Sequence, residues 1–413
     1  MSDSISPEDG IGQGRTQAGH HLWVVLLLIT GVVLAQNLMR QGLPVLYPFI
    51  QNEFGLSRAQ VGLITSFQAI GFGATVLLGG WLADSFGVKR IIIVSLFSLT
   101  AVILTFPLAS SFAIILTLAV FIGIASSSLH PATASAVMDW FPVRIRAFAM
   151  SFRKTGVPIC GAIMAAVLPA LAIVIGWRMA AAVTGLLVLI IAIAFMSLYR
   201  DAPRGIQAVR KFNLNTFKTI WQNRGLVITI TWGTAFAGFQ SIVLTYFMLF
   251  LIEELELSPV MAGGMLAIAQ VSSIIARVTW GAVSDFIFHG RRIVVLAITG
   301  FITVLWMLGI SLTSVGTPST AVYLIAITIG ISTLSFHGVS NTIIGEQAEK
   351  GQVGVTIGVS STMNNASQVV MPPLFGYLVD ISGSYNVIWR GTAAAALACT
   401  LILLTFGREP QRR

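Results

Sequence analysis

Basic residues inside apolar stretches are the side chains best suited to chemistry in this chain. Arg40 and Arg277 lie well within long apolar runs, and Arg153 and Lys154 lie about two helical turns inside another. An unpaired cation in hydrocarbon costs at least ~2.5 kcal/mol, so such side chains should face a cavity or a partner. No Asp or Glu lies near the middle of an apolar run. We therefore expect the missing counter-charge to be an anionic ligand, which a planar guanidinium can hold through two parallel hydrogen bonds.

These cations also have a purely structural interpretation. Arg40 or Arg277 would then bind backbone carbonyls at a broken helical turn. Arg153 would extend along its helix toward the membrane surface, as long basic side chains do. The sequence leaves both interpretations open, with Arg40, Arg277 and Arg153 as candidate ligand-binding residues.

Two histidines occupy matching positions in two apolar runs: His130 in 112–140 and His337 in 321–345. Imidazole is the side chain that changes protonation near neutral pH, so either residue is a candidate proton carrier as well as a ligand contact. The alternative is a histidine that simply completes a hydrogen-bond network. Amide side chains in other runs are candidate ligand contacts, or equally interhelical hydrogen bonds. They are Asn37, Gln240, Asn341 and Asn364.

A charged pattern occurs twice in short gaps between apolar runs. In the first copy Gly80, Asp84 and Gly87 are followed by the basic pair Lys89 and Arg90. The second copy consists of Gly281, Asp285, Gly290, Arg291 and Arg292. The two aspartates are 201 residues apart, about half of the 413-residue chain. This repeat predicts two homologous halves, as in many secondary transporters.

Composition places these elements in a membrane, because 56% of residues are hydrophobic, 9% are charged and the mean hydropathy is +0.88. A soluble domain carries roughly 25% charge. The sequence contains about twelve apolar runs of ~20 residues, each long enough to cross a bilayer, which predicts an all-α protein of twelve transmembrane helices. The first run would serve as an uncleaved signal, and neither Cys160 nor Cys399 is expected to form a disulfide.

Charge asymmetry predicts the orientation, because 17 of the 24 Lys and Arg fall in the tails and loops of one side and three in the opposite loops. By the positive-inside rule both termini are expected in the cytoplasm, with the chain in the inner membrane. The net charge of +9 is thus explained by topology and does not indicate nucleic-acid binding. The expected organisation is a tail (1–20), a six-helix bundle (21–199), a cytoplasmic linker (200–224), a second bundle (225–407) and a tail (408–413).

The repeated loop pattern resembles the signature of the major facilitator superfamily, Gly-x-x-x-Asp-x-x-Gly with a basic cluster, and the resemblance covers essentially the whole chain. Val88 replaces one basic residue, and the second copy has one extra residue before Gly290. Stretches around Arg40, Arg153, Arg277 and 372–385 resemble anion permeases, including cyanate and nitroimidazole permease-like members and the anion:cation symporter group. The resemblance implies two pseudo-symmetric six-helix bundles, with the runs that carry His130 and His337 lining a central cavity.

The same resemblance implies a role for the two loop patterns, as a latch that joins the cytoplasmic ends of the halves in the outward-open state. The latch residues would be Asp84, Gly87, Lys89, Arg90, Asp285, Arg291 and Arg292. A carboxylate at a helix end can engage backbone dipoles, which is consistent with this role.

These observations predict a monomeric secondary transporter that moves a small organic anion, most simply a carboxylate, across the bilayer by alternating access with proton symport. No cofactor, metal cluster or nucleophile motif is expected, so an enzyme is excluded. Two alternatives remain: proton-coupled drug efflux, and a membrane sensor or scaffold that does not transport.

Overall fold

The computed structural model describes residues 8–201, 220–349 and 352–409, and every regular element in these ranges is helical. Helices suit a bilayer because each satisfies its own backbone hydrogen bonds. The first group of helices is α1 (Glu8–Phe54), α2 (Arg58–Phe86), α3 (Val88–Leu104), η1 (Phe106–Leu108), α4 (Phe112–Ser127), α5 (Leu129–Trp140), α6 (Val143–Ile175) and α7 (Trp177–Leu198). The second group is α9 (Arg224–Glu253), α10 (Pro259–Ala282), η2 (Val283–Ile287), α11 (Arg292–Ile310), α12 (Ser319–Ile331), α13 (His337–Gln347), α14 (Val353–Ser382) and α15 (Tyr385–Phe406).

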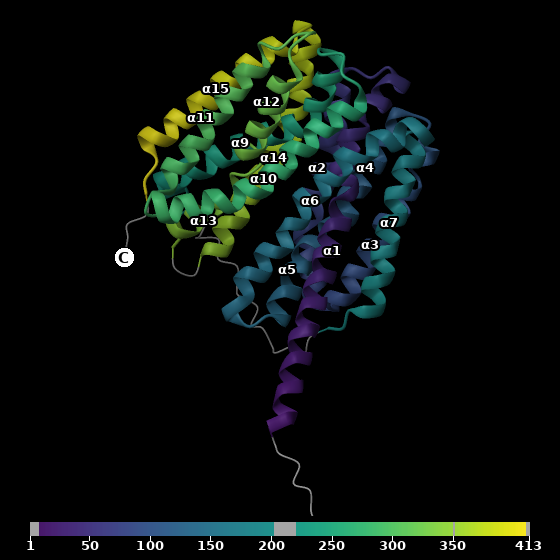
Figure 1. Cartoon of the computed structure of the whole chain (residues 1–413), viewed down its shortest axis with the longest axis vertical. Coiled ribbons are helices and arrows are strands. Elements are labelled where there is room, and N and C mark those ends of the chain that lie inside the picture. The colour runs from purple at the N-terminus through teal and green to yellow at the C-terminus, as the bar shows by residue number, and fades with distance from the viewer. Residues whose placement is uncertain (1–7, 202–219, 350–351, 410–413) are drawn as a thin grey trace, which may run out of the picture.

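The helices form two bundles that lie side by side (Figure 1). The N-terminal bundle contains α1–α7 and the C-terminal bundle contains α9–α15. Between the bundles, α2 packs against α14 and α6 packs against α10. We call the end where α2 begins the Arg58 end, and the end where α11 begins the Arg292 end. The bundles approach each other at the Arg58 end, whereas the start of α1 extends beyond the opposite end (Figure 1).

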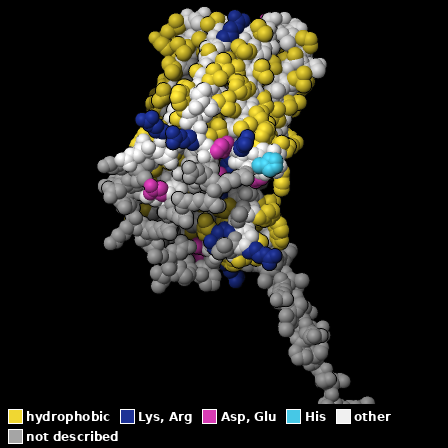
Figure 2. All heavy atoms as spheres, turned by 90° about the vertical axis from the view of Figure 1, so that its left-hand side faces the viewer, with side chains coloured by type: hydrophobic (Ala, Val, Ile, Leu, Met, Phe, Trp, Pro, Cys, Tyr) yellow, Lys and Arg dark blue, Asp and Glu magenta, His cyan; other side chains and the backbone are white. Residues whose placement is uncertain are grey.

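The outer surface suits a lipid environment. Figure 2 shows a broad band of hydrophobic side chains, with charged side chains gathered mainly below it and few within it. Among the described residues, ten helical stretches are long and apolar enough to cross a membrane. The expected twelve spans include two that fall outside this set: the run 321–345 is divided into α12 and α13, and α14 is long enough but carries many polar residues.

Two of the expected spans are interrupted near their middle. The run 112–140 breaks between α4 and α5 because Pro131 has no N–H to donate to the carbonyl of Ser127. The run 321–345 is interrupted between Ile331 and His337, where the hydroxyls of Ser332 and Ser335 bond the carbonyls of Thr328 and Ile331. Such local side-chain bonds compete with the helical pattern. Both breaks place a histidine next to irregular backbone.

Small residues let the bundles approach closely at the Arg58 end. A Cβ added to Gly62 of α2 would lie 2.6 Å from the carbonyl carbon of Pro372 in α14. A Cβ on Gly376 of α14 would likewise meet the backbone of Arg58. Because backbone atoms cannot rotate aside, any side chain at these positions would push the two helices apart.

Candidate functional site

Arg277 lies on α10 beside the interruption between α12 and α13. Its Nη2 donates to the carbonyl of Leu334 over 2.9 Å, and the indole of Trp280, one turn along, donates to the carbonyl of Ile331. These contacts satisfy carbonyls that the broken helix releases. The structural interpretation of Arg277 therefore holds for one of its N–H groups. Its Nε is buried and has no partner among the described residues.

Arg40 lies at the boundary between the bundles. Its Nη2 donates to Oε1 of Gln368 on α14 over 2.9 Å. Its guanidinium carbon lies 5.1 Å from the centroid of the Phe72 ring, within the range of a cation–π contact. Arg40 thus contacts an amide from the opposite bundle and not a backbone carbonyl.

The two histidines have different surroundings. His130 at the start of α5 is exposed, and its ring meets the edge of Phe72 at a centroid distance of 6.4 Å. His337 at the start of α13 is partly exposed and stacks on Phe336 at 4.1 Å. Its Nε2 lies 2.7 Å from Oε1 of Gln240 on α9. Because an amide oxygen only accepts, this contact requires the Nε2–H form of His337.

The cations and histidines form one central cluster, which we define as Arg40, Lys154, Arg277, His130 and His337. Arg277, Lys154 and Arg40 are near enough to His337 for their charges to influence it, and Arg153, Lys154 and Arg40 are near enough to influence His130. The members come from α1, α5, α6, α10 and α13, so both bundles contribute. The ion pairs of the described residues involve none of these cations.

The neighbouring basic residues of α6 have separate environments. Arg153 is 2% exposed, and its Nη1 donates to the hydroxyl of Thr133 on α5 over 2.7 Å. Lys154 is exposed, and no hydrogen bond or ion pair of its side chain occurs within the described residues. The accessible cation of α6 is therefore Lys154. Arg153, our candidate from sequence, is packed between α5 and α6 within its own bundle.

The candidate amides are distributed over several contacts. Gln240 meets His337 as described above. Asn37 donates to the carbonyl of Val33 in its own helix, and Asn364 meets the Thr234 hydroxyl at 3.3 Å. Asn341 is partly exposed on α13. Gln368, which contacts Arg40, lies four residues after Asn364, a spacing that places both amides on the same face of α14.

The repeated loop patterns bond mainly within their own bundles. The backbone N–H of Lys89 donates to Asp201, and Gly87 has φ +96, a conformation that favours glycine. Arg90 is exposed, and the side chain of Asp84 lies outside the described residues.

In the second pattern, Arg292 is held by Asp285 at 3.1 Å and by Glu346 at 2.7 Å, and its backbone N–H donates to Glu409. Arg292, Asp285 and Glu346 belong to the C-terminal bundle, and Glu409 follows its last helix. The neighbouring Arg291 is exposed. Residues 202–219 of the expected linker lie outside the described residues.

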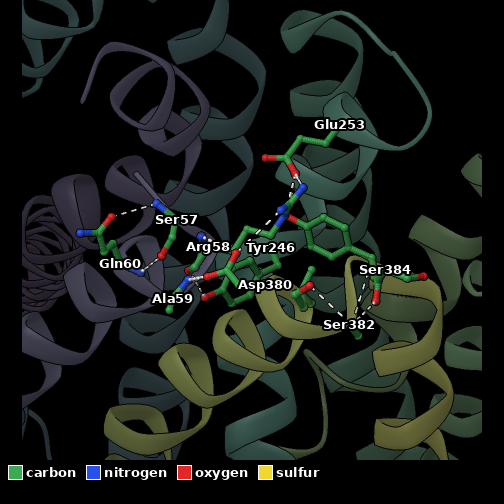
Figure 3. Close-up of polar contacts among 11 residues, drawn as sticks. Ser57, Arg58, Ala59, Gln60, Tyr246, Glu253, Asp380, Ser382 and Ser384 are labelled. Atoms are coloured by element: carbon green, nitrogen blue, oxygen red, sulfur yellow. Dashed lines mark hydrogen bonds and ion pairs between the residues drawn. The ribbon is translucent and has the colours of Figure 1, made fainter. Parts of the chain in front are cut away.

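A polar cluster joins the bundles at the Arg58 end (Figure 3). The Arg58 side chain of α2 pairs with Glu253 of α9 at 2.7 Å and with Asp380 of α14 at 3.7 Å. The two carboxylate oxygens of Asp380 accept the backbone N–H groups of Arg58 and Ala59 at 3.0 and 2.9 Å. Asp380 thus caps the first turn of a helix in the other bundle, where the helix dipole favours negative charge.

Backbone contacts extend this junction inward. The Tyr246 hydroxyl of α9 lies 2.8 Å from the carbonyls of both Arg58 and Pro372. The Ser66 hydroxyl of α2 bonds the carbonyl of Val369, which has no helical donor because Pro373 lacks an N–H. The sequence did not reveal this junction, because its partners lie 195 and 322 residues apart in the chain.

The molecule has the architecture of a secondary transporter: its membrane-spanning helices form two bundles, and a polar cluster lies at the boundary between them. A family model for the Major Facilitator Superfamily matches residues 29–365 and again 288–413. The chain belongs to this superfamily. The family and fold class predicted from the sequence are thereby confirmed, and the chain is a multi-pass membrane protein of a transporter family and not an enzyme.

Individual relatives agree with this assignment. The hexuronate transporter of Bacillus subtilis (strain 168) is 24% identical over 407 residues, covering 93% of this chain and 94% of that protein. The probable galactarate/D-glucarate transporter GarP of Escherichia coli (strain K12) is 24% identical over 430 residues, covering 94% and 95%. Among solved structures, a point mutant of the nucleoside transporter NupG has a TM-score of 0.80 at 13% identity, covering 93% of this chain and all of that chain.

Proposed function

We propose that this protein is a secondary transporter that carries a small organic anion, most simply a carboxylate, through the central cluster. The observation that carries the proposal is the convergence of Arg40, Lys154 and Arg277 without an acidic partner among the described residues. Full-length relatives named for hexuronate and for galactarate/D-glucarate support an acidic cargo. A drug-efflux site for lipophilic cations fits poorly, because three cationic side chains would repel such a cargo.

Transport is proposed to proceed by alternating access of two bodies, 21–199 and 225–407, joined by the linker 200–224. The junction at the Arg58 end is closed, and the loop patterns at the Arg292 end bond within their own bundles. With both termini in the cytoplasm, the Arg58 end would face outward, and a closed junction at that end would correspond to an inward-facing state. In the outward-open state the loop patterns would latch the Arg292 end.

Coupling to protons is proposed to pass through one of the two histidines. His337 is the better supported candidate because it has a defined hydrogen-bond partner in Gln240, whereas the ring of His130 meets only the edge of Phe72. Binding of an anion beside His337 would favour the imidazolium, since the nearby cations would then be balanced. Proton and anion would thus be taken up together.

The experiment uses purified protein in liposomes and measures uptake of radiolabelled carboxylates with and without an inward proton gradient. Arg40→Gln and Arg277→Gln should each abolish uptake while the protein remains folded, as judged by size-exclusion chromatography. The matched control is Arg144→Gln, an exposed arginine at the start of α6 that makes no described hydrogen bond or ion pair with its side chain. Uptake by both cluster variants at the wild-type rate would overturn the proposal.

A further inference from the structure

Lys154 has no acidic partner among the described residues. It lies on α6, is exposed, and makes no hydrogen bond or ion pair with any described residue. An ammonium has three N–H donors, and none of the three has a partner among the described residues. A lysine that only extended toward the membrane surface would not be expected to act on both central histidines, as this one does.

The position of Lys154 groups it with Arg277. α6 and α10 pack against each other in opposite directions, with Gly161 against the side chain of Gln270 and Gly263 against the backbone of Ala165. Lys154 lies seven residues before Gly161 and Arg277 lies seven residues after Gln270, so the two cations are at the same level of this helix pair. Arg40 instead contacts Phe72 on α2 and Gln368 on α14, which form the other pair of helices packed between the bundles. The cluster therefore has two groups of donors: Arg277 with Lys154, and Arg40 with Gln368.

Each group retains unused donors. Arg40 uses one N–H in its bond to Gln368, and a guanidinium has five. Arg277 uses one for Leu334, while its buried Nε lacks a partner among the described residues. Two arginines with free N–H groups can each hold an oxyanion, and Lys154 adds a second positive charge beside Arg277.

Charge balance favours a cargo with more than one negative charge. A single carboxylate would neutralise one of the three cations of the central cluster and leave the other two without a counter-charge in a region of low dielectric. A cargo with an acidic group at each end would place one anion in each donor group and leave a single excess charge. It would also connect Arg40 and Lys154 of the N-terminal bundle with Arg277 of the C-terminal bundle.

We propose that the cargo carries two acidic groups, one bound by Arg40 beside Gln368 and the other by Arg277 together with Lys154. Lys154 is then the residue that distinguishes a diacid from a monoacid. This inference rests on the proposed function, since it refines the cargo of the same site. It assigns to Lys154 a role in specificity that neither Arg153 nor the histidines can fill.

The test compares two acids that differ only at one end. D-Glucarate is a six-carbon diacid, and D-gluconate has the same hydroxylated chain with a single carboxylate. Binding of each acid to the purified full-length protein is measured by isothermal titration calorimetry in detergent. The wild type should bind the diacid about 10-fold or more tightly, as expected for one additional charge-assisted contact.

Variants of Lys154 separate this role from folding. Lys154→Gln should weaken glucarate binding by about 10-fold or more, and should weaken gluconate binding less, so that the preference for the diacid is reduced. Lys154→Arg should restore most of the preference, and Arg144→Gln should behave as the wild type. Size-exclusion chromatography of Lys154→Gln shows whether the variant is folded.

The outcomes separate the two proposals. Equal wild-type affinity for the two acids, or equal loss of both in Lys154→Gln, would overturn the inference while leaving an anion site in place. Binding of neither acid by the wild type, together with no uptake of any carboxylate in liposomes, would overturn the proposed function as well.

Discussion

Asp380 is the residue whose replacement should most directly change the balance between conformations. Its carboxylate accepts two backbone N–H groups at the start of α2, from Arg58 and Ala59, and lies 3.7 Å from the Arg58 guanidinium. Asp380→Asn keeps the size of the side chain but removes its charge. One of the two acceptor oxygens becomes an NH₂ group that faces a backbone donor. At least one of the two capping bonds is therefore lost.

The expected cost follows from these contacts. A hydrogen bond to a charged acceptor contributes about 1.5–3 kcal/mol. Loss of the favourable interaction between a carboxylate and a helix N-terminus adds about 0.3–1 kcal/mol. The Arg58 pair adds only about 0.2–1 kcal/mol, because the two side chains are 32% and 23% exposed. We expect the closed Arg58 end to be destabilised by about 2–5 kcal/mol, which is a shift of about 30-fold to 4,000-fold in the equilibrium between conformations.

Double electron–electron resonance can measure this shift. Spin labels are placed on cysteines at Asn52 in α1 and Val260 in α10, which are exposed near the Arg58 end of opposite bundles. Cys160 and Cys399 are first replaced by alanine. In Asp380→Asn the population with the longer distance between labels should increase, because separation at this end no longer breaks the cap.

A nearby acid supplies the matched control. Glu256 is exposed in the loop between α9 and α10, and its side chain makes no described hydrogen bond or ion pair. Glu256→Gln removes the same charge and should leave the distance distribution unchanged. If Asp380→Asn gave the wild-type distribution, or if both variants shifted it equally, the assignment of Asp380 as a cross-bundle cap would be refuted.

Other contacts lead to three further predictions. Gly62→Ala should also separate the Arg58 end, because the added methyl group meets the α14 backbone, and the same resonance measurement detects it. Thr133→Val removes the Nη1 partner of buried Arg153 and should lower the free energy of unfolding by about 1–3 kcal/mol, measured by thermal unfolding in detergent. His337→Gln should remove the stimulation of uptake by a proton gradient while counterflow exchange continues, if His337 carries the coupling proton; persistent stimulation would contradict that role.

The sequence predicted the membrane helices and the family well because both depend on local patterns. Apolar runs and the repeated Gly–Asp–Gly–basic pattern are read directly from consecutive residues. The interruptions were harder to place. A proline such as Pro131 marks a break visibly in the sequence, but the break between α12 and α13 has no proline and depends on serine side chains that bond nearby carbonyls. Such competition between alternative local bonds is not visible in hydropathy.

The candidate site was predicted less completely, since it depends on which way side chains face. Arg40 and Arg277 stand out because charge in an apolar run is costly anywhere in a bilayer. Arg153 and Lys154 are adjacent, and only their positions around α6 separate a buried side chain from an accessible one. Asp380 could not be found from its own surroundings, because its role comes from backbone groups 321 and 322 residues away in the chain.

The contrast between the two ends of the molecule indicates how alternating access would be balanced. At the Arg58 end, charges and backbone groups of opposite bundles satisfy one another, so separation would leave a helix N-terminus without its carboxylate. At the Arg292 end, Arg292 already has Asp285 and Glu346 within its own bundle. When that end closes, Arg292 can keep these ion pairs or exchange them for pairs with the other bundle. Closure therefore does not require fully solvated charges to form new ion pairs. The main barrier to the opposite conformation would therefore be the junction around Arg58 and Asp380, and the cargo must offset its loss by holding both bundles at the central cluster.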